Sequence, residues 1–111
     1  MMIQNKSKVT TVVDPAIYAD SLFEGMFGLI FYREPIGMIF QTHFGIHTFF
    51  MRYAIDVLIL NKRNKVVEMT AGLRPNRLYF WNPMYSTVVE LPEGSIEKSK
   101  TKVGDFLEFM I

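Results

Sequence analysis

Apolar residues occur along this chain in short blocks, and polar or turn-forming residues separate these blocks about every ten positions. Short apolar blocks rich in valine, isoleucine, threonine and aromatic residues predict β-strands. The polar run 61–64 between two apolar runs predicts a hairpin. A bend is expected near Tyr53 and Ala54. Strands are therefore expected over residues 8–13, 38–40, 66–71, 85–91 and 106–111, with two more inside 46–60.

One stretch near the N-terminus has a different period. Asp14 followed by Pro15 is typical of a helix start, with an N-cap and a proline at the first helical position. Apolar residues then recur at helical spacing from Ala19 to Ile30. We expect a helix over residues 16–27 that packs on a sheet, and a short helical turn over 95–100.

These elements predict a mostly β fold of the α+β class, a compact antiparallel β-sandwich or jelly-roll-like barrel with one N-terminal helix. Residues 1–7 are polar enough to predict a flexible tail, and residues 8–111 are expected to form a single domain. A chain of 111 residues that is 50% hydrophobic can bury one core.

Charge and composition remove several classes of function. Twelve basic and eleven acidic residues give a net charge of +1, which disfavours nucleic acid as a partner. The chain has no cysteine, so disulfides, thiolate zinc sites and cysteine nucleophiles are excluded. No apolar run reaches the ~18 residues of a membrane span. We expect a cytoplasmic protein without a cofactor and without a membrane partner.

Several segments, taken in order, resemble the DUF192 family of uncharacterised proteins, also called UPF0127. The resemblance covers about residues 9–109, and its segments are Gly28-Leu29, Gly37-Met38-Ile39-Phe40, Ile46-His47-Thr48-Phe49-Phe50-Met51-Arg52, Ile55-Asp56-Val57, Val89-Glu90-Leu91-Pro92-Glu93-Gly94 and Gly104-Asp105. Many members carry Trp, Pro and Arg where this chain has Phe50, Ala54 and Gly25. The resemblance implies a compact jelly-roll-type sandwich and brings no established activity.

Three charged residues lie in apolar sequence, where a charge needs a partner. Asp56 is interpreted either as a general base or, with more weight, as a carboxylate that accepts backbone N–H bonds. Arg52 can clamp an anionic ligand or pair with Glu90. Glu90 shares a strand face with Val88 and is expected either inside and paired or on the solvent side.

The two histidines, His43 and His47, stand four residues apart, but Gly45 lies between them and the sequence offers no third ligand. A metal site is therefore not expected. His47 is a candidate general base because histidine titrates near neutral pH. A half-buried histidine bonded to a backbone carbonyl is the commoner outcome.

The loop expected over residues 73–83 carries two arginines and three aromatic residues. Arg74, Arg77 and Trp81 form a candidate ligand-binding set, because arginine and aromatic rings can grip an anionic ring or stack on bases. In the alternative interpretation, Trp81 and Phe80 close one end of the core.

The leading hypothesis is a non-enzymatic module that binds a small molecule or a protein partner. Its candidate surface consists of His47, Arg52, Asp56, Arg74, Arg77 and Trp81, with Glu90 as a further ligand-binding candidate. One alternative is a small metal-independent enzyme that uses Asp56 or His47 as its base. A weaker one is single-stranded RNA binding through residues 74–81. A homodimer that pairs through the terminal strand at 106–111 is a further alternative.

Overall fold

Ten strands and one short helix make up the part of the chain that this computed structural model describes, which is residues 1–19, 36–43, 45–49 and 51–111. The elements are β1 (Met2–Asn5), β2 (Thr10–Val13), β3 (Ala16–Tyr18), β4 (Gly37–Gln41), β5 (Ile46–His47), β6 (Ile55–Leu60), β7 (Val66–Leu73), β8 (Leu78–Tyr79), β9 (Thr87–Pro92), α2 (Ser95–Ser99) and β10 (Leu107–Met110).

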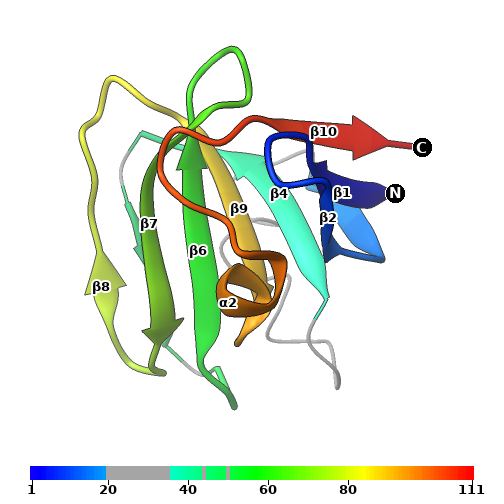
Figure 1. Cartoon of the computed structure of the whole chain (residues 1–111). Helices are drawn as coiled ribbons and strands as arrows, with labels where there is room; N and C mark the ends of the chain where they lie inside the picture. Colours follow the sequence, from blue (N-terminus) through cyan, green and yellow to red (C-terminus); the bar gives the residue numbers. More distant parts are fainter. Residues whose placement is uncertain (20–35, 44, 50) are drawn as a thin grey trace.

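A five-stranded sheet with the order β3-β4-β9-β6-β7 forms the centre of the fold (Figure 1). Every residue of β6 is buried, which explains its unbroken apolar run, because a strand covered on both faces does not alternate apolar and polar residues. β6 and β7 pair antiparallel, so the predicted hairpin is confirmed.

Two apolar clusters lie on the two faces of this sheet. On one face, Leu58, Leu60 and Leu91 pack with side chains of the three-stranded sheet β10-β1-β2 and with Ile96 of α2. On the other face, Val57 and Ile59 pack with side chains of the small β5-β8 sheet and with Trp81. The layers agree with the predicted sandwich, and Figure 1 shows open sheets rather than a closed barrel.

The N-terminal residues are not a flexible tail, so that prediction is wrong. β1 is the middle strand of the three-stranded sheet, between β10 and β2. Ile3 is fully buried in the core, and Asn5 is fully buried as well. The polar sequence predicted an exposed segment, but the side-chain amide of Asn5 is hydrogen-bonded inside the protein.

A buried polar network holds Asn5. Its amide nitrogen donates to Thr101 Oγ1 at 3.0 Å and to Asp105 Oδ2 at 2.9 Å, and Lys8 Nζ pairs with Asp105 at 2.7 Å. Burial by itself raises the pKa of Asp105, but the hydrogen bonds from Lys8, Asn5 and the Lys102 amide lower it below its ordinary value. This network joins the first strand to the last turn of the chain.

The helix predicted from residue 16 is also corrected. Ala16–Tyr18 is strand β3, which pairs parallel with β4 through Ala16 opposite Gly37. The backbone of β4 packs closely at this point, because a Cβ on Gly37 would lie 2.6 Å from a methyl group of Val13. The pairing with β4 therefore overrides the helix-start signal of Asp14-Pro15. Residues 20–27, the rest of the predicted helix, lie outside the described residues.

The short helical turn predicted over residues 95–100 is confirmed as α2. Ser99 Oγ donates to the Ser95 carbonyl at 2.7 Å, and Ser95 Oγ donates to the Pro92 carbonyl at 2.6 Å. No helix among the described residues is long and apolar enough to cross a membrane.

Candidate functional site

Asp56 accepts three backbone hydrogen bonds from two distant segments. Its Oδ1 accepts from the Gly72 amide at 2.9 Å, and its Oδ2 accepts from the amides of Gly94 at 3.1 Å and Ile96 at 2.9 Å. The side chain is 1% exposed. Asp56 thus ties β6 to the end of β7 and to the start of α2, which supports the structural interpretation of this carboxylate.

Glu90 lies on the opposite face of the sheet from Asp56. In the register, Glu90 of β9 stands between Met38 of β4 and Val57 of β6, whereas Asp56 stands opposite Leu91. The two carboxylates therefore do not form a pair. Burial raises the pKa of Glu90 to about 8.

Tyr53 lies close enough to sense the Glu90 charge. Burial raises the pKa of Tyr53, and the electrostatic effect of Glu90 raises it further. Arg52 is exposed, and the one ion pair among the described residues joins Lys8 to Asp105. The structure therefore does not bring Arg52 and Glu90 together as a salt bridge, and a ligand-binding role for Glu90 stays a prediction.

The outward face of the β5-β8 sheet gathers exposed apolar side chains. Ile46 and Tyr79 stand opposite each other and point into the core, so their neighbours His47 and Leu78, also opposite each other, point outward. The ring of His47 stacks on Phe49 with 5.2 Å between the ring centroids. Phe49 is 39% exposed and Leu78 is 58% exposed.

Phe80 extends this face. The register that pairs Ile46 with Tyr79 places Gly45 beside Phe80, and a Cβ on Gly45 would lie 2.5 Å from the phenyl ring. Gly45 also has a φ of +88°, which an L side chain rarely adopts. Phe80 is 65% exposed. We call His47, Phe49, Leu78 and Phe80 the aromatic face.

Thr48 fixes the loop that carries Arg74 and Arg77, beside the aromatic face. Its hydroxyl donates to the Arg74 carbonyl at 2.6 Å and accepts from the Arg77 amide at 2.9 Å, while its own amide donates to the Arg77 carbonyl at 2.9 Å. Thr48 is 1% exposed. Both arginine side chains remain exposed on a loop whose backbone is anchored.

Replacing Thr48 by valine is expected to lower the free energy of unfolding by about 2 kcal/mol, because two hydrogen bonds are lost at a buried site without a change of shape. Chemical denaturation measures this value, and faster amide exchange at Arg77 should accompany the loss. Thr11→Val, at an exposed strand position, is the matched control and should change stability by no more than about 0.5 kcal/mol. Equal stability of the two variants would contradict the role of Thr48.

Trp81 and Phe80, two large aromatic residues of the loop, differ in burial. Trp81 is 8% exposed, and its indole nitrogen donates to the Tyr85 carbonyl at 2.7 Å. Trp81 therefore closes the core, as the alternative interpretation held. In that interpretation Phe80 also closes the core, but it lies at the surface. Neighbouring side chains on a strand point to opposite faces, and Tyr79 and Trp81 on either side of Phe80 both point into the core.

His43 and His47 make hydrogen bonds to different segments of the chain. His43 Nδ1 donates to the Pro83 carbonyl at 2.6 Å, and His47 Nδ1 accepts from the Phe49 amide at 3.3 Å. Within the described ranges, no three histidine or acidic side chains are grouped so that they could hold a metal ion. His47 belongs to the aromatic face, and Asp56 lies beneath α2, so the structure does not support a shared general-base site.

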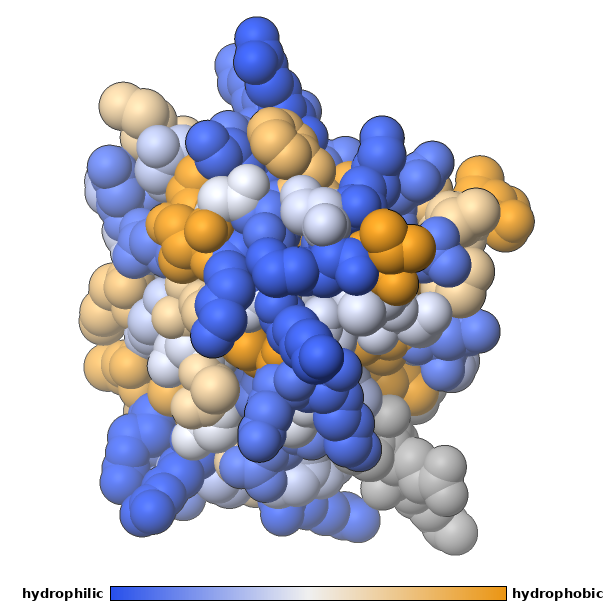
Figure 2. Space-filling view, in the orientation of Figure 1, coloured by the Kyte–Doolittle hydropathy of each residue, from blue (hydrophilic) through white to orange (hydrophobic). Residues whose placement is uncertain are grey.

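Among the clefts lined by described residues, three provide further candidate sites. Two of them flank α2 and share Ala71 and Glu97; one is lined by Asp56, Glu93 and Glu97, the other by Lys8, Lys100 and Lys102. Figure 2 shows hydrophilic side chains running across the middle of this face. The first cleft has an acidic lining, in which Asp56 is already bonded to backbone amides, and the second combines three lysines with Glu97.

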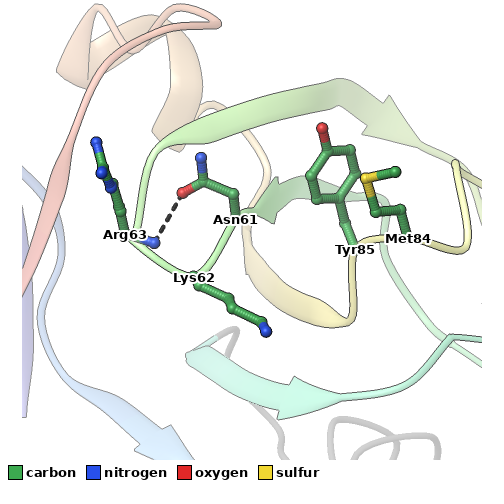
Figure 3. Close-up of a pocket in the computed structure, with 5 residues that line it drawn as sticks. All are labelled: Asn61, Lys62, Arg63, Met84 and Tyr85. Atoms are coloured by element: carbon green, nitrogen blue, oxygen red, sulfur yellow. Dashed lines mark hydrogen bonds between the residues drawn. The ribbon is translucent and has the colours of Figure 1, made fainter.

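The third cleft has a volume of about 430 Å³ and lies between the β6–β7 turn and the loop before β9 (Figure 3). Its lining comes from Asn61, Lys62, Arg63, Met84 and Tyr85. Sequence reasoning missed this cleft because the turn and the loop are far apart in the chain. It also missed Phe49, Leu78 and Thr48, for which the alternation across β5 and β8 was the available signal.

Comparisons with known proteins agree with this architecture. A UPF0127 protein of Pyrococcus furiosus is 36% identical over 98 residues, covering 83% of this chain and 84% of its own length. A UPF0127 protein of Pyrococcus horikoshii is 31% identical over 114 residues, covering 97% and 98%.

A crystal structure of a protein of unknown function from Novosphingobium aromaticivorans matches with a TM-score of 0.80 and 19% identity, covering 97% of this chain and 82% of that one, which shows a shared fold. The DUF192 family, described as an uncharacterized ACR, matches residues 2–109. The chain therefore belongs to the DUF192 family, whose members include the UPF0127 proteins.

Proposed function

We propose that this domain is a non-enzymatic binding module that docks a protein segment on the aromatic face. The supporting observation is the grouping of Phe49, Leu78 and Phe80, each at least 39% exposed, on one outward surface of β5-β8. Scattered exposed apolar residues are common, whereas a contiguous group is typical of an interaction site.

The neighbouring charges favour an acidic partner. Arg74 and Arg77 are exposed on the loop that Thr48 anchors, next to Leu78. Arginines at the rim of an apolar patch attract carboxylates and orient the partner. The expected ligand is a peptide segment with apolar or aromatic side chains flanked by Asp or Glu.

A peptide selection tests this function. Phage-displayed random peptides selected on the wild-type domain should be enriched in apolar residues next to acidic ones. The double variant Leu78→Ser/Phe80→Ser should bind the selected synthetic peptides at least about tenfold more weakly, because large side chains at the centre of a patch carry most of the binding energy. Arg77→Glu should weaken acidic peptides and spare neutral ones.

Val103→Ser is the matched control, because Val103 is 57% exposed and lies outside the aromatic face. It should bind the peptides as the wild type does. Thermal unfolding of each variant must show a folded domain. If the double variant binds with wild-type affinity, or if no peptide family is enriched, the aromatic face is not a docking surface.

A further inference from the structure

The cleft between the β6–β7 turn and the loop before β9 carries a site separate from the aromatic face. Its volume of about 430 Å³ lies within the range of small-molecule pockets, near the lower end. Its lining combines an aromatic ring, an amide and two cationic side chains. These are groups that can hold one small, flat, negatively charged molecule.

The wall made by the β6–β7 turn is rigid. Asn61 Oδ1 accepts from the amides of Arg63 at 2.9 Å and Lys65 at 3.0 Å, and Asn64 closes the turn in a left-handed conformation with a φ of 62°. These two bonds fix which way the Asn61 amide points. Nδ2 makes no hydrogen bond to any described residue, so its N–H groups are available to an acceptor on a ligand.

The opposite wall is held by its own bonds. The Asn82 carbonyl accepts from the Tyr85 amide at 3.1 Å, and Asn82 Oδ1 accepts from the Met84 amide at 3.0 Å. The Tyr85 carbonyl accepts from the indole of Trp81, which is buried in the core. Tyr85 therefore stands on an anchored loop, and its ring can serve as a stacking surface.

Neither cationic side chain of the cleft pairs with a carboxylate of a described residue. Within the described residues, the one ion pair joins Lys8 to Asp105, so Lys62 and Arg63 have no carboxylate partner there. In Figure 3, the side chains of Arg63, Asn61 and Tyr85 extend to the same side of the turn, and that of Lys62 extends to the other side. An anion near Arg63 gains a fork of N–H donors.

From this arrangement we infer that the cleft binds a free nucleoside monophosphate. The base stacks on Tyr85 beside the Met84 thioether, a base acceptor takes an N–H of Asn61, and the phosphate binds Arg63. The volume holds one nucleotide, and the net charge of +1 gives little attraction for a polynucleotide. This site goes beyond the proposed docking function and does not depend on it.

Nuclear magnetic resonance titration with adenosine monophosphate tests the inference. The chain has one tryptophan, so a single indole N–H signal reports on the bond from Trp81 to Tyr85. A saturable shift with a Kd of about 1 mM or tighter is expected, as befits a small open site. Adenosine and inorganic phosphate, each lacking half of the ligand, should bind at least about tenfold more weakly.

Arg63→Gln should weaken binding of adenosine monophosphate about tenfold, because it removes the charged fork from an exposed position without disturbing the core. Lys98→Gln, at an exposed lysine of α2 outside the cleft, should leave the affinity unchanged. Tyr85→Leu should remove the preference for the nucleotide over phosphate. If Tyr85→Leu does not fold, the Arg63→Gln and Lys98→Gln variants still decide the question.

The inference is wrong if no indole shift appears up to ~10 mM adenosine monophosphate, far above the expected Kd. It is also wrong if Arg63→Gln and Lys98→Gln bind adenosine monophosphate equally well. Tighter binding of a single-stranded hexaadenylate than of the mononucleotide would overturn the assignment to a free nucleotide. Loss of peptide docking in the Leu78→Ser/Phe80→Ser variant should leave this titration unaffected.

Discussion

Asp56→Ala is expected to lower the free energy of unfolding by about 4 kcal/mol, the largest effect of any single substitution considered for this chain. The change leaves the amides of Gly72, Gly94 and Ile96 without their acceptor. A hydrogen bond to a charged group contributes about 1.5–3 kcal/mol, and three bonds to one carboxylate add less than their sum. Urea denaturation of the purified domain measures the loss.

The companion variant Asp56→Asn should lose about half as much. An asparagine has one acceptor oxygen, so it can retain the bonds to Gly94 and Ile96 only by turning its NH₂ group toward the Gly72 amide. Glu97→Ala, at an exposed acid that lines the same cleft, should stay within about 0.5 kcal/mol of the wild type. If Asp56→Ala lost less than about 1 kcal/mol, the structural role would be wrong.

Asp56 also shows how far the sequence alone could lead. Its position in an apolar run predicted a carboxylate bonded to backbone amides, which agrees with the structure. The partners could not be predicted, because their amides lie 16, 38 and 40 residues away. Local sequence identifies a group that needs partners, whereas tertiary pairing decides which groups supply them.

The strands also differ in whether local sequence alone predicts them. β6, β7 and β9 were predicted because long apolar runs and turn residues are local signals. β1 and β3 were missed because they gain their stability by pairing with β10, β2 and β4, which lie elsewhere in the chain. A short polar strand such as Met2–Asn5 has no periodicity that could reveal it.

The aromatic face depends on a single choice of register. Moving the β5-β8 pairing by one residue would point Phe80 inward and Trp81 outward, since neighbouring side chains alternate. The sequence shows three consecutive aromatic residues and cannot tell which of them is buried. The structure makes the choice through Gly45, which leaves room for the Phe80 ring on the outer side.

Glu90→Gln is expected to remove most of the loss of stability that the wild type shows between about pH 5 and pH 8. Burial raises the pKa of Glu90 from 4.5 to about 8 in the folded protein. Below pH 4.5 Glu90 is protonated in both the folded and the unfolded protein, so it does not make the stability depend on pH. Between those two pH values the unfolded chain releases the proton and the folded chain keeps it, so stability falls as pH rises.

The loss should reach a few kcal/mol by about pH 8 and then level off, since each unit of raised pKa corresponds to about 1.4 kcal/mol. Urea denaturation at several pH values measures it for the wild type and for Glu90→Gln. Any other group that titrates in this interval is present in both proteins and cancels in the difference. Glu93→Gln, at an exposed neighbour, should follow the wild-type curve. Parallel curves for the wild type and Glu90→Gln from pH 5 to 8 would show that Glu90 is ionised in the folded protein and held by a partner that stabilises its charge.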